Sequence, residues 1–461
     1  MSSVTGSFAI HRVGEFTHSL RLDAVPADVR RQAALSLLDT IGCMVAGSAT
    51  SDAGALLAAE GADAEGRSTV VGHARRLSPR AAARCNGYLG DIFELNDLTG
   101  GHASIATVAA AMTAAEAADA SGRALLEAVT AGIEATTRIY NAVYPTLKSR
   151  DKSGMSPISV ANAVGAAAAA ARLRRLDASR HQEALAIAAA LAGWCPSEAM
   201  AGPASSVKPI LFGGWPASTG LLAAQYAEAG LSGPPRILES PVGWMATVAE
   251  SPNLAALDDP AWALARPRRK WHACCGYNHA AIDTVLSIRD RHPGLLEKAR
   301  SVQLSLPPYT MHTVVKPTPP TAPNEARFHI RYITAVAAAC GGPILPEHSE
   351  ECLRYLAQPT VADAYEKISV VPDGTLTHYH QARARVELAD GSVLEQDGGA
   401  PRGTPDNPLS DDDVRAKFMR LAAPVLGTSA AENLRSMIEG ISNAPDTHQL
   451  FALLRPGTPG D

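Results

Sequence analysis

The spacing of apolar residues divides the chain into a long helical part and a shorter mixed part. Between about residues 26 and 229, apolar positions recur three and four residues apart, as in "PADVRRQAALSLLDTIGCMVAGS" and "SGRALLEAVTAGIEATTRIYNAV". This period places the apolar side chains on one face of a helix. Ser121 precedes the second segment and is a suitable N-cap. The pattern therefore predicts a helical domain.

Alanine dominates two further segments of this part, "SVANAVGAAAAAARLRRL" and "SRHQEALAIAAALAGW". Alanine has the highest helix propensity, and its small side chain lets neighbouring helices approach closely. We therefore expect these segments to be helices buried among other helices.

The period changes near residue 266. "SVQLSLPP" (301–308) and "QARARVELADGSVLEQD" (381–397) alternate polar and apolar residues, which is typical of strands, and "ADG" is typical of a hairpin turn. Residues 398–461 return to helical spacing, with Ser410 as a cap followed by acids in the first turn. We predict a mainly α protein with a smaller α+β domain: a helical domain of residues 1–265, completed by 398–461, and an α+β lid of residues 266–397.

Charge and composition exclude several classes of function. The 461 residues carry a formal net charge of -5, so the chain has no basic footprint for nucleic acid. No apolar stretch is convincing as a membrane span, and no secretory leader is visible. The seven cysteines are odd in number and scattered, which favours reduced thiols in the cytoplasm.

One cluster could be imagined as a metal site. "HACCGYNH" contains His272, Cys274, Cys275 and His279, but no second CxxC or HxxxH completes a ligand set. The alternative is a loop whose thiols pack inward and whose histidines face a cleft or solvent. No glycine-rich dinucleotide motif follows a strand, and "GPASSVKPILFGG" lacks the ending of a P-loop. We expect neither a metal nor a cofactor.

The stretch "ELNDLTGGHAS" (94–104) interrupts two alanine-rich helical segments with residues that can carry chemistry. His102 titrates near neutral pH, and Asp97 or Glu94 could hold its ring. Two glycines before it allow an unusual backbone and close approach of a ligand. The alternative interpretation is a connection in which Asp97 or Thr99 caps the next helix.

Several motifs resemble those of the MmgE/PrpD family, which includes 2-methylcitrate dehydratase, cis-aconitate decarboxylase and iminodisuccinate epimerase. The matching segments follow the family's order: "LLDTIGCMVAGS", "NGYLGDIFELNDLTGGHAS", "VGAAAAAARL", "SSVKPILFGGWPASTGLLAAQYAEAG", "KWHACCGYNHAAID", "NEARFHIRY" and "PRGTPDNPLSDDDVRAKF". The resemblance implies a helical domain joined to an α+β lid, a homodimer, and a reaction that moves a proton at a carbon next to a carboxylate.

The resemblance also implies the site residues. His102 matches the proton shuttle, with Asp97 orienting it; Lys208 matches the family's lysine; and His279 matches a lid-side acid or carboxylate binder. The substrate-binding positions expected from the same alignment and from their chemistry are Glu94, Thr99, Ser156, His272, Tyr309, Arg327 and Arg402. An arginine such as Arg327 can hold a carboxylate through two hydrogen bonds, or it can pair with a nearby acid such as Glu325.

The polar residues depart from the family's pattern at several positions. Asn96 stands where an aspartate is usual, Ala103 replaces a proline, Ser156 takes a histidine position and His272 takes a tyrosine position. We therefore keep three functions: a lyase acting on a small di- or tricarboxylate, with dehydration ahead of decarboxylation; an epimerase of an imino- or hydroxy-dicarboxylate; and an inactive binding protein on the same scaffold.

Overall fold

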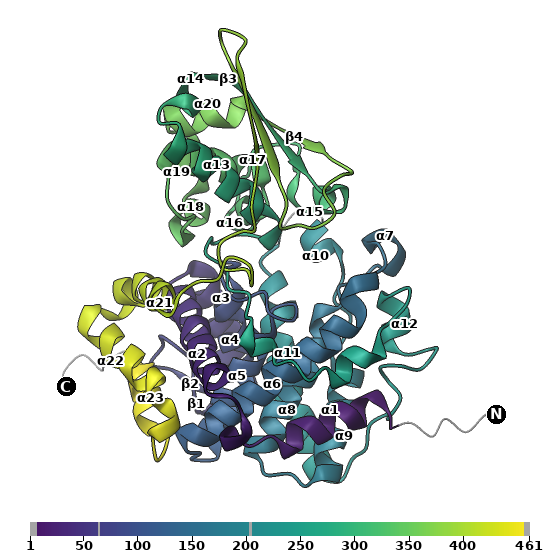
Figure 1. Cartoon of the computed structure of the whole chain (residues 1–461). Helices are drawn as coiled ribbons and strands as arrows, with labels where there is room; N and C mark the ends of the chain where they lie inside the picture. The colour runs from purple at the N-terminus through teal and green to yellow at the C-terminus, as the bar shows by residue number, and fades with distance from the viewer. Residues whose placement is uncertain (1–6, 63–64, 202–204, 456–461) are drawn as a thin grey trace.

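The computed structural model describes residues 7–62, 65–201 and 205–455. It contains a helical body and a smaller unit of helices and strands above it (Figure 1). The predicted fold class, mainly α with a smaller α+β part, is confirmed. The exact limits 1–265, 266–397 and 398–461 stay a prediction.

The body is built on long helices. They are α1 (Ala9–Ser19), α2 (Ala27–Gly47), α3 (Ser51–Gly61), α4 (Pro79–Asp91), α5 (Ala103–Ala117), α6 (Gly122–Val143), α8 (Ile158–Leu173), α9 (Ala178–Leu191) and α11 (Trp215–Glu228). Short helices α7 (Arg150–Ser153), α10 (Glu198–Ala201) and α12 (Trp244–Val248) lie between them, with a small hairpin of β1 (Glu65–Thr69) and β2 (Arg76–Leu77). Ser121 caps α6, as predicted, by accepting from the Ala124 N–H at 3.2 Å.

The alanine-rich helix α8 is the centre of this body. Helices α5, α6, α9 and α11 surround it, and nearly all of its side chains are buried. A Cβ atom at Gly165 would lie 2.5 Å from the Gly132 carbonyl oxygen of α6, so only glycine permits this approach. The small side chains therefore serve the close helix packing that their composition predicted.

The lid holds a four-stranded sheet in the order β4-β3-β5-β6. Its strands are β3 (Ala299–Leu306), β4 (Ile368–Pro372), β5 (Arg383–Leu388) and β6 (Val393–Asp397). β3 is parallel to β4 and antiparallel to β5, with Val302 opposite both Ile368 and Val386. β5 and β6 form the predicted hairpin, in which Gly391 takes a positive φ of 83°.

Helices cover one side of this sheet (Figure 1). The principal ones are α13 (His279–Arg291), α17 (Ile330–Cys340) and α20 (Pro359–Lys367). Shorter helices are α14 (Leu295–Lys298), α15 (Met311–Val314), α16 (Pro323–Arg327), α18 (Pro346–Glu350) and α19 (Cys352–Leu356). The buried residues of the lid form a hydrophobic core largely separate from that of the body.

The last helices return to the body. They are α21 (Asp411–Leu426), α22 (Thr428–Glu439) and α23 (His448–Leu453), and α21 packs along α2. Ser410 and Asp413 form a reciprocal capping box at the start of α21. On α21, buried Lys417 pairs with Asp39 of α2 at 2.7 Å and donates to the carbonyl oxygens of Leu95 and Lys270.

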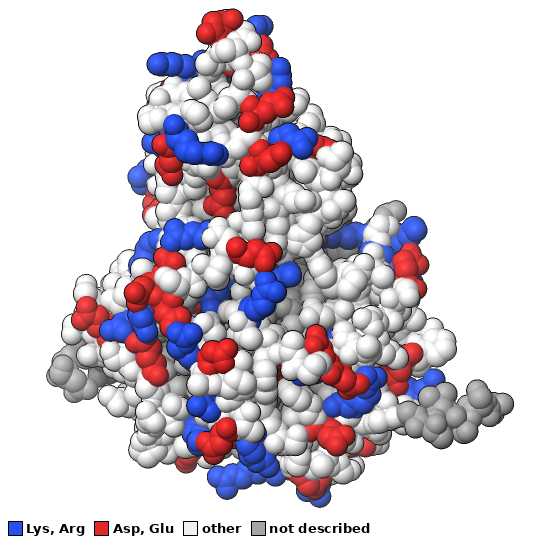
Figure 2. Space-filling model, viewed as in Figure 1, with Lys and Arg blue, Asp and Glu red and all other residues white. Residues whose placement is uncertain are grey.

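The charged side chains on the surface reflect the small net charge of the sequence. Lysine and arginine are interspersed with aspartate and glutamate on the face shown in Figure 2. Among the described helices, none is by itself both long and apolar enough to cross a membrane; α2 and α3 combine enough length and apolar character only as a pair, which is bent by 90°. All seven cysteines are free, and every one except Cys340 is buried.

Candidate active site

The loop before α5 has a backbone that few sequences could adopt. Gly100, Gly101 and His102 have φ angles of 50°, 68° and 71° in succession, and Glu94 has 53°. A side chain at Gly100 would collide with Thr137, and one at Gly101 with the ring of Tyr140. A left-handed histidine costs about 1–3 kcal/mol, a strain that is characteristic of functional sites. The two glycines therefore bring the loop against α6 and leave His102 at its end.

His102 is buried and held in one orientation. Its Nδ1 lies 3.1 Å from Oδ1 of Asn96, and its ring meets the edge of Phe212 at 5.6 Å between centroids. An amide oxygen only accepts hydrogen bonds, so Nδ1 carries the proton and Nε2 remains an acceptor. Burial, with a contribution from Lys270, holds the pKa of His102 well below its usual value. The imidazole is therefore neutral at neutral pH.

The prediction that Asp97 orients His102 is wrong. Asp97 accepts hydrogen bonds from Oγ and N of Ser104, at 2.7 and 3.3 Å, and so holds the first turn of α5. Burial raises its pKa to about 6. Thr99 does not cap this helix with its side chain; its hydroxyl accepts from the Arg268 N–H at 3.0 Å. Asp97 therefore acts at the start of α5, as the alternative interpretation expected. Asn96 holds the ring of His102, which is the role predicted for Asp97.

Lys208 belongs to a buried group of four charges. Its ammonium lies 2.7 Å from Oδ2 of Asp91, also pairs with Glu94, and sits 4.2 Å from the centre of the Phe212 ring. Lys270 Nζ contacts the other Glu94 oxygen at 2.6 Å. Burial lowers the pKa of Lys208 to about 8, and Asp91 opposes that shift. The formal charges of these four residues sum to zero, so protein carboxylates already pair with Lys208. Its expected contact with the substrate stays a prediction.

An enclosed cavity of about 90 Å³ lies where the body meets the lid. The body and the lid both contribute lining residues. Those of the body are Glu94, Leu98, Gly101, His102, Tyr140, Tyr144, Arg150, Ile158, Met200 and Phe212, and those of the lid are Arg268, Cys275, Gly276, Tyr277, Thr313, Phe328 and Tyr379. Polar groups converge on an otherwise aromatic and apolar surface, as in most small-molecule sites. Of the predicted site residues, His102 and Glu94 line it.

The two lid histidines lie beside this cavity without lining it. His279 Nε2 is 3.4 Å from the Cys274 carbonyl oxygen, and the rings of His279 and His272 meet at 5.0 Å. Both nitrogens of His272 are occupied, Nε2 by Asp283 at 2.9 Å and Nδ1 by the Ile344 N–H at 3.1 Å. Burial lowers the pKa of His279 well below its usual value. Neither histidine lines the cavity, and their expected contacts with the substrate stay a prediction.

Four other predicted substrate-binding residues also lie outside the cavity lining. Arg327 pairs with Glu350 and donates to Asn324 at 2.6 Å. Arg402 pairs with Asp413 at 2.6 Å and stacks on Trp271, and Ser156 bonds Cys195 through its backbone N–H. Tyr309 accepts from the Tyr379 N–H at 2.8 Å, so it supports a lining residue. Each arginine forms an ion pair with an acid, which is the alternative weighed for Arg327, although its partner is Glu350 and not Glu325.

Two arginines at the cavity were missed by the sequence analysis. Arg150 lines it beside Tyr277, and among the described residues its buried Nη1 has no hydrogen-bond partner. Arg268 donates to the Tyr379 hydroxyl at 3.2 Å. Among the described residues, neither guanidinium lies within 4.0 Å of a carboxylate. Arg268 stands in the run "RPRRK", where no pattern separates it from its neighbours.

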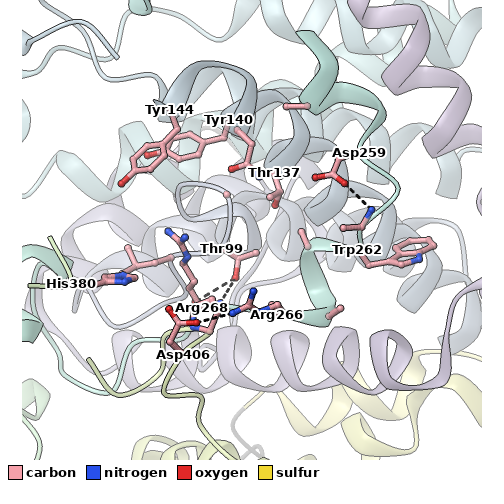
Figure 3. A pocket seen from close by; sticks show the side chains of 18 of the residues that line it. Thr99, Thr137, Tyr140, Tyr144, Asp259, Trp262, Arg266, Arg268, His380 and Asp406 are labelled. Atoms are coloured by element: carbon pink, nitrogen blue, oxygen red, sulfur yellow. Dashed lines mark hydrogen bonds and ion pairs between the residues drawn. The ribbon is translucent and has the colours of Figure 1, made fainter. Parts of the chain in front are cut away.

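A larger open cleft of about 1030 Å³ adjoins the enclosed cavity (Figure 3). The two share Leu98, Tyr140, Tyr144 and Arg268 as lining residues. Thr99, the remaining predicted residue of the loop, faces this cleft.

The arrangement suits proton transfer to or from a bound anion. A neutral histidine supplies a proton acceptor, and two guanidinium groups without a protein carboxylate partner supply positive charge. Within the described ranges, no three or more histidine, cysteine or acidic side chains are arranged to hold a metal ion.

Comparison with known proteins places this site in a family. The model of the MmgE/PrpD N-terminal domain matches residues 11–256, and that of the MmgE/PrpD C-terminal domain matches residues 272–443. The chain is 26% identical to a cis-aconitate decarboxylase-like protein of Aspergillus oryzae, over 94% of this chain and 95% of the relative. It is 26% identical to cis-aconitate decarboxylase of Homo sapiens (100% and 96%) and 27% to that of Mus musculus (99% and 94%). Since both family domains match and together span most of its length, the chain belongs to the MmgE/PrpD family.

Proposed function

We propose that the protein is a cofactor-independent lyase that acts on a small tri- or dicarboxylate and moves a proton at a carbon next to a carboxylate. The observation that carries this proposal is His102: a neutral, buried imidazole, fixed by Asn96, on the wall of a cavity that also holds two guanidinium groups. A perturbed histidine in such a cavity is a typical acid–base catalyst.

Decarboxylation of an unsaturated tricarboxylate is the first candidate, because the relatives that match over nearly the whole chain are named cis-aconitate decarboxylases. In this reaction a C–C bond breaks and CO₂ leaves. The electron pair moves through the adjacent double bond to a carbon beside a second carboxylate, and that carbon takes one proton. A polyanion bound next to His102 raises its pKa, so the imidazolium can supply this proton.

Dehydration is the second candidate, and the acceptor Nε2 of His102 favours it. Neutral His102 would take the proton next to a carboxylate, and the resulting imidazolium would return it to the departing hydroxyl as water. The two candidates require opposite starting states of the same side chain, so their rates should depend on pH in opposite directions.

The other charges have supporting roles in this proposal. Arg150, with its buried unpartnered nitrogen, binds one carboxylate of the substrate. Lys208 and Lys270 neutralise Asp91 and Glu94, so the wall beside His102 does not repel an anion. The cation for the substrate thus comes chiefly from arginine, and not from Lys208 as the family resemblance implied.

NMR in deuterated water tests the proposal with three probes: cis-aconitate, citrate and malate. Decarboxylation releases CO₂ and leaves deuterium in the product, dehydration gives an unsaturated acid, and epimerisation exchanges the α-hydrogen without loss of atoms. His102→Gln should lower the observed rate by about 10²–10⁴-fold. The control is His448→Gln on α23, which is exposed and far along the chain from the loop.

Equal rates for His102→Gln and the wild-type protein would contradict the assignment of His102. Binding of these carboxylates without any of the three reactions would favour the inactive binding protein.

A further inference from the structure

The mouth of the enclosed cavity carries a guanidinium, Arg268, to which the proposed function assigns no particular carboxylate of the substrate. Arg268 lines both the open cleft and the enclosed cavity, and Figure 3 shows it extending toward the space between Tyr144 and His380. Its neighbour Arg266 is paired with Asp406 at 2.8 Å. Among the described residues Arg268 has no such carboxylate, so an anion arriving from the cleft meets it unopposed.

The backbone fixes Arg268 at this position. Its carbonyl oxygen accepts from the Leu98 N–H at 2.8 Å, and its own N–H donates to Thr99 Oγ1 at 3.0 Å. Nη1 donates to the Tyr379 hydroxyl at 3.2 Å, which leaves other guanidinium donors available. The loop that ends in His102 therefore also places Arg268.

Two histidines complete the polar lining of the mouth. The rings of His378 and His380 lie 4.3 Å apart between centroids, and both face the cleft. Nε2 of His380 is buried and has no hydrogen-bond partner within the described part of the chain. Burial and the proximity of Arg268 lower the pKa of both rings, so they are neutral donors or acceptors beside a single strong cation.

We infer that Arg268, His378 and His380 form an anion subsite at the cavity mouth that binds a carboxylate beyond those held inside. This inference rests on the proposed function in one respect, that the enclosed cavity binds a small carboxylate. It adds that the preferred ligand is a tricarboxylate whose third carboxylate lies against Arg268. A guanidinium with an unpartnered imidazole nitrogen beside it can hold both oxygens of such a group.

Equilibrium binding of unreactive probes tests the subsite without any turnover. The probes are tricarballylate, with three carboxylates, and glutarate, with two, measured by calorimetry on the full chain. The test variant is Arg268→Gln. The matched control is Arg266→Gln, which removes an arginine two residues away that lines only the cleft.

Wild-type protein should bind tricarballylate more tightly than glutarate. Arg268→Gln should weaken tricarballylate binding by at least tenfold and glutarate binding by less than threefold, and Arg266→Gln should change neither by more than threefold. Equal losses for both probes, no loss, or no wild-type preference would overturn the subsite. These outcomes are separate from the proposed lyase reaction, which fails if cis-aconitate, citrate and malate are all left unconverted even though binding of the unreactive probes is selective.

Discussion

Nδ1 of His102 lies 3.1 Å from the amide oxygen of Asn96, and both side chains are buried. A neutral amide in this position fixes the ring without adding negative charge. The family pattern has an aspartate here, which would stabilise the imidazolium through its charge. The structure therefore couples the identity of residue 96 to the protonation state of His102.

Replacing this amide by a carboxylate should move the pH dependence of catalysis. Wild-type His102 has a pKa well below 6.5, so its titration should appear on the acid side of the profile in the free protein. Asn96→Asp should raise that pKa, because the charged partner favours the protonated ring. The limb of the kcat/KM profile that belongs to His102 should therefore move to higher pH.

The direction of the shift is the same for either reaction, but its effect at pH 7 is not. A dehydratase that needs neutral His102 should lose activity, and a decarboxylase that needs the imidazolium should gain it. A profile that does not move would show that Asn96 does not control the titration of His102.

Asp97→Asn is the matched change at the adjacent position, and it should leave the pH profile of activity unchanged. Asp97 contacts Ser104 and not His102, and an asparagine oxygen can still accept from Ser104. We expect kcat/KM within about threefold of wild type, since no acid–base group is removed. A loss of 10²-fold or more would restore the orienting role that the sequence predicted for Asp97.

The same variant should change how stability depends on pH. Burial raises the folded-state pKa of Asp97 to about 6, from its ordinary value of 3.8. Between these values the folded chain holds a proton that the unfolded chain has lost, so the contribution of Asp97 to stability falls as pH rises from about 4 to about 6. Two pKa units correspond to about 3 kcal/mol. Urea unfolding at pH 4 and pH 7 should show Asp97→Asn gaining relative to wild type at the higher pH.

The sequence predicted the helices and strands well because their periods are strong. Ser121, Ser410 and the hairpin at Gly391 were all found from local patterns whose physical basis lies within a few residues. His102 was chosen from the unusual pair of glycines and a histidine between helices together with the family resemblance, and the structure places it on the cavity wall. In each case the informative contacts are close along the chain.

The charge network of the site could not be predicted in this way. Lys208 meets Asp91 across 117 positions, and Lys270 meets Glu94 across 176. Asn96 and Asp97 are adjacent and similar, and only the turn of the backbone decides which one reaches His102. Arg268 has arginine neighbours, so its place at the cavity follows from its backbone contacts with the loop and from no feature of its own.

Lys208 should prove important to stability as well as to function. Lys208→Met removes a partner from buried Asp91 and Glu94, and Glu94 keeps Lys270 while Asp91 is left without an ion pair. Breaking one side of a buried ion pair typically costs about 3–5 kcal/mol. Urea unfolding should show a loss of this size. The double variant Lys208→Met/Asp91→Asn should recover a large part of it, and a double variant no more stable than Lys208→Met would contradict the pairing.

An apolar patch on the body provides a test of assembly. Leu191, Trp194 and Trp215 are 40%, 70% and 42% exposed, at the end of α9, just after it and at the start of α11. A Cβ atom at Gly193 would lie 3.4 Å from Nε1 of Trp215, so the end of α9 and the start of α11 adjoin. Large exposed apolar side chains grouped in this way often mark interfaces between subunits. We propose that the protein forms a two-fold dimer through this patch, so that the same surface meets itself.

Light scattering at micromolar concentration should give twice the chain mass of 48.0 kDa. Trp194→Glu places a charge in the patch and should shift the protein toward monomer. Val242→Glu is the control, because Val242 is 97% exposed and lies outside the patch in sequence. If wild-type protein is a monomer, or if Trp194→Glu remains as dimeric as Val242→Glu, the patch is not the interface.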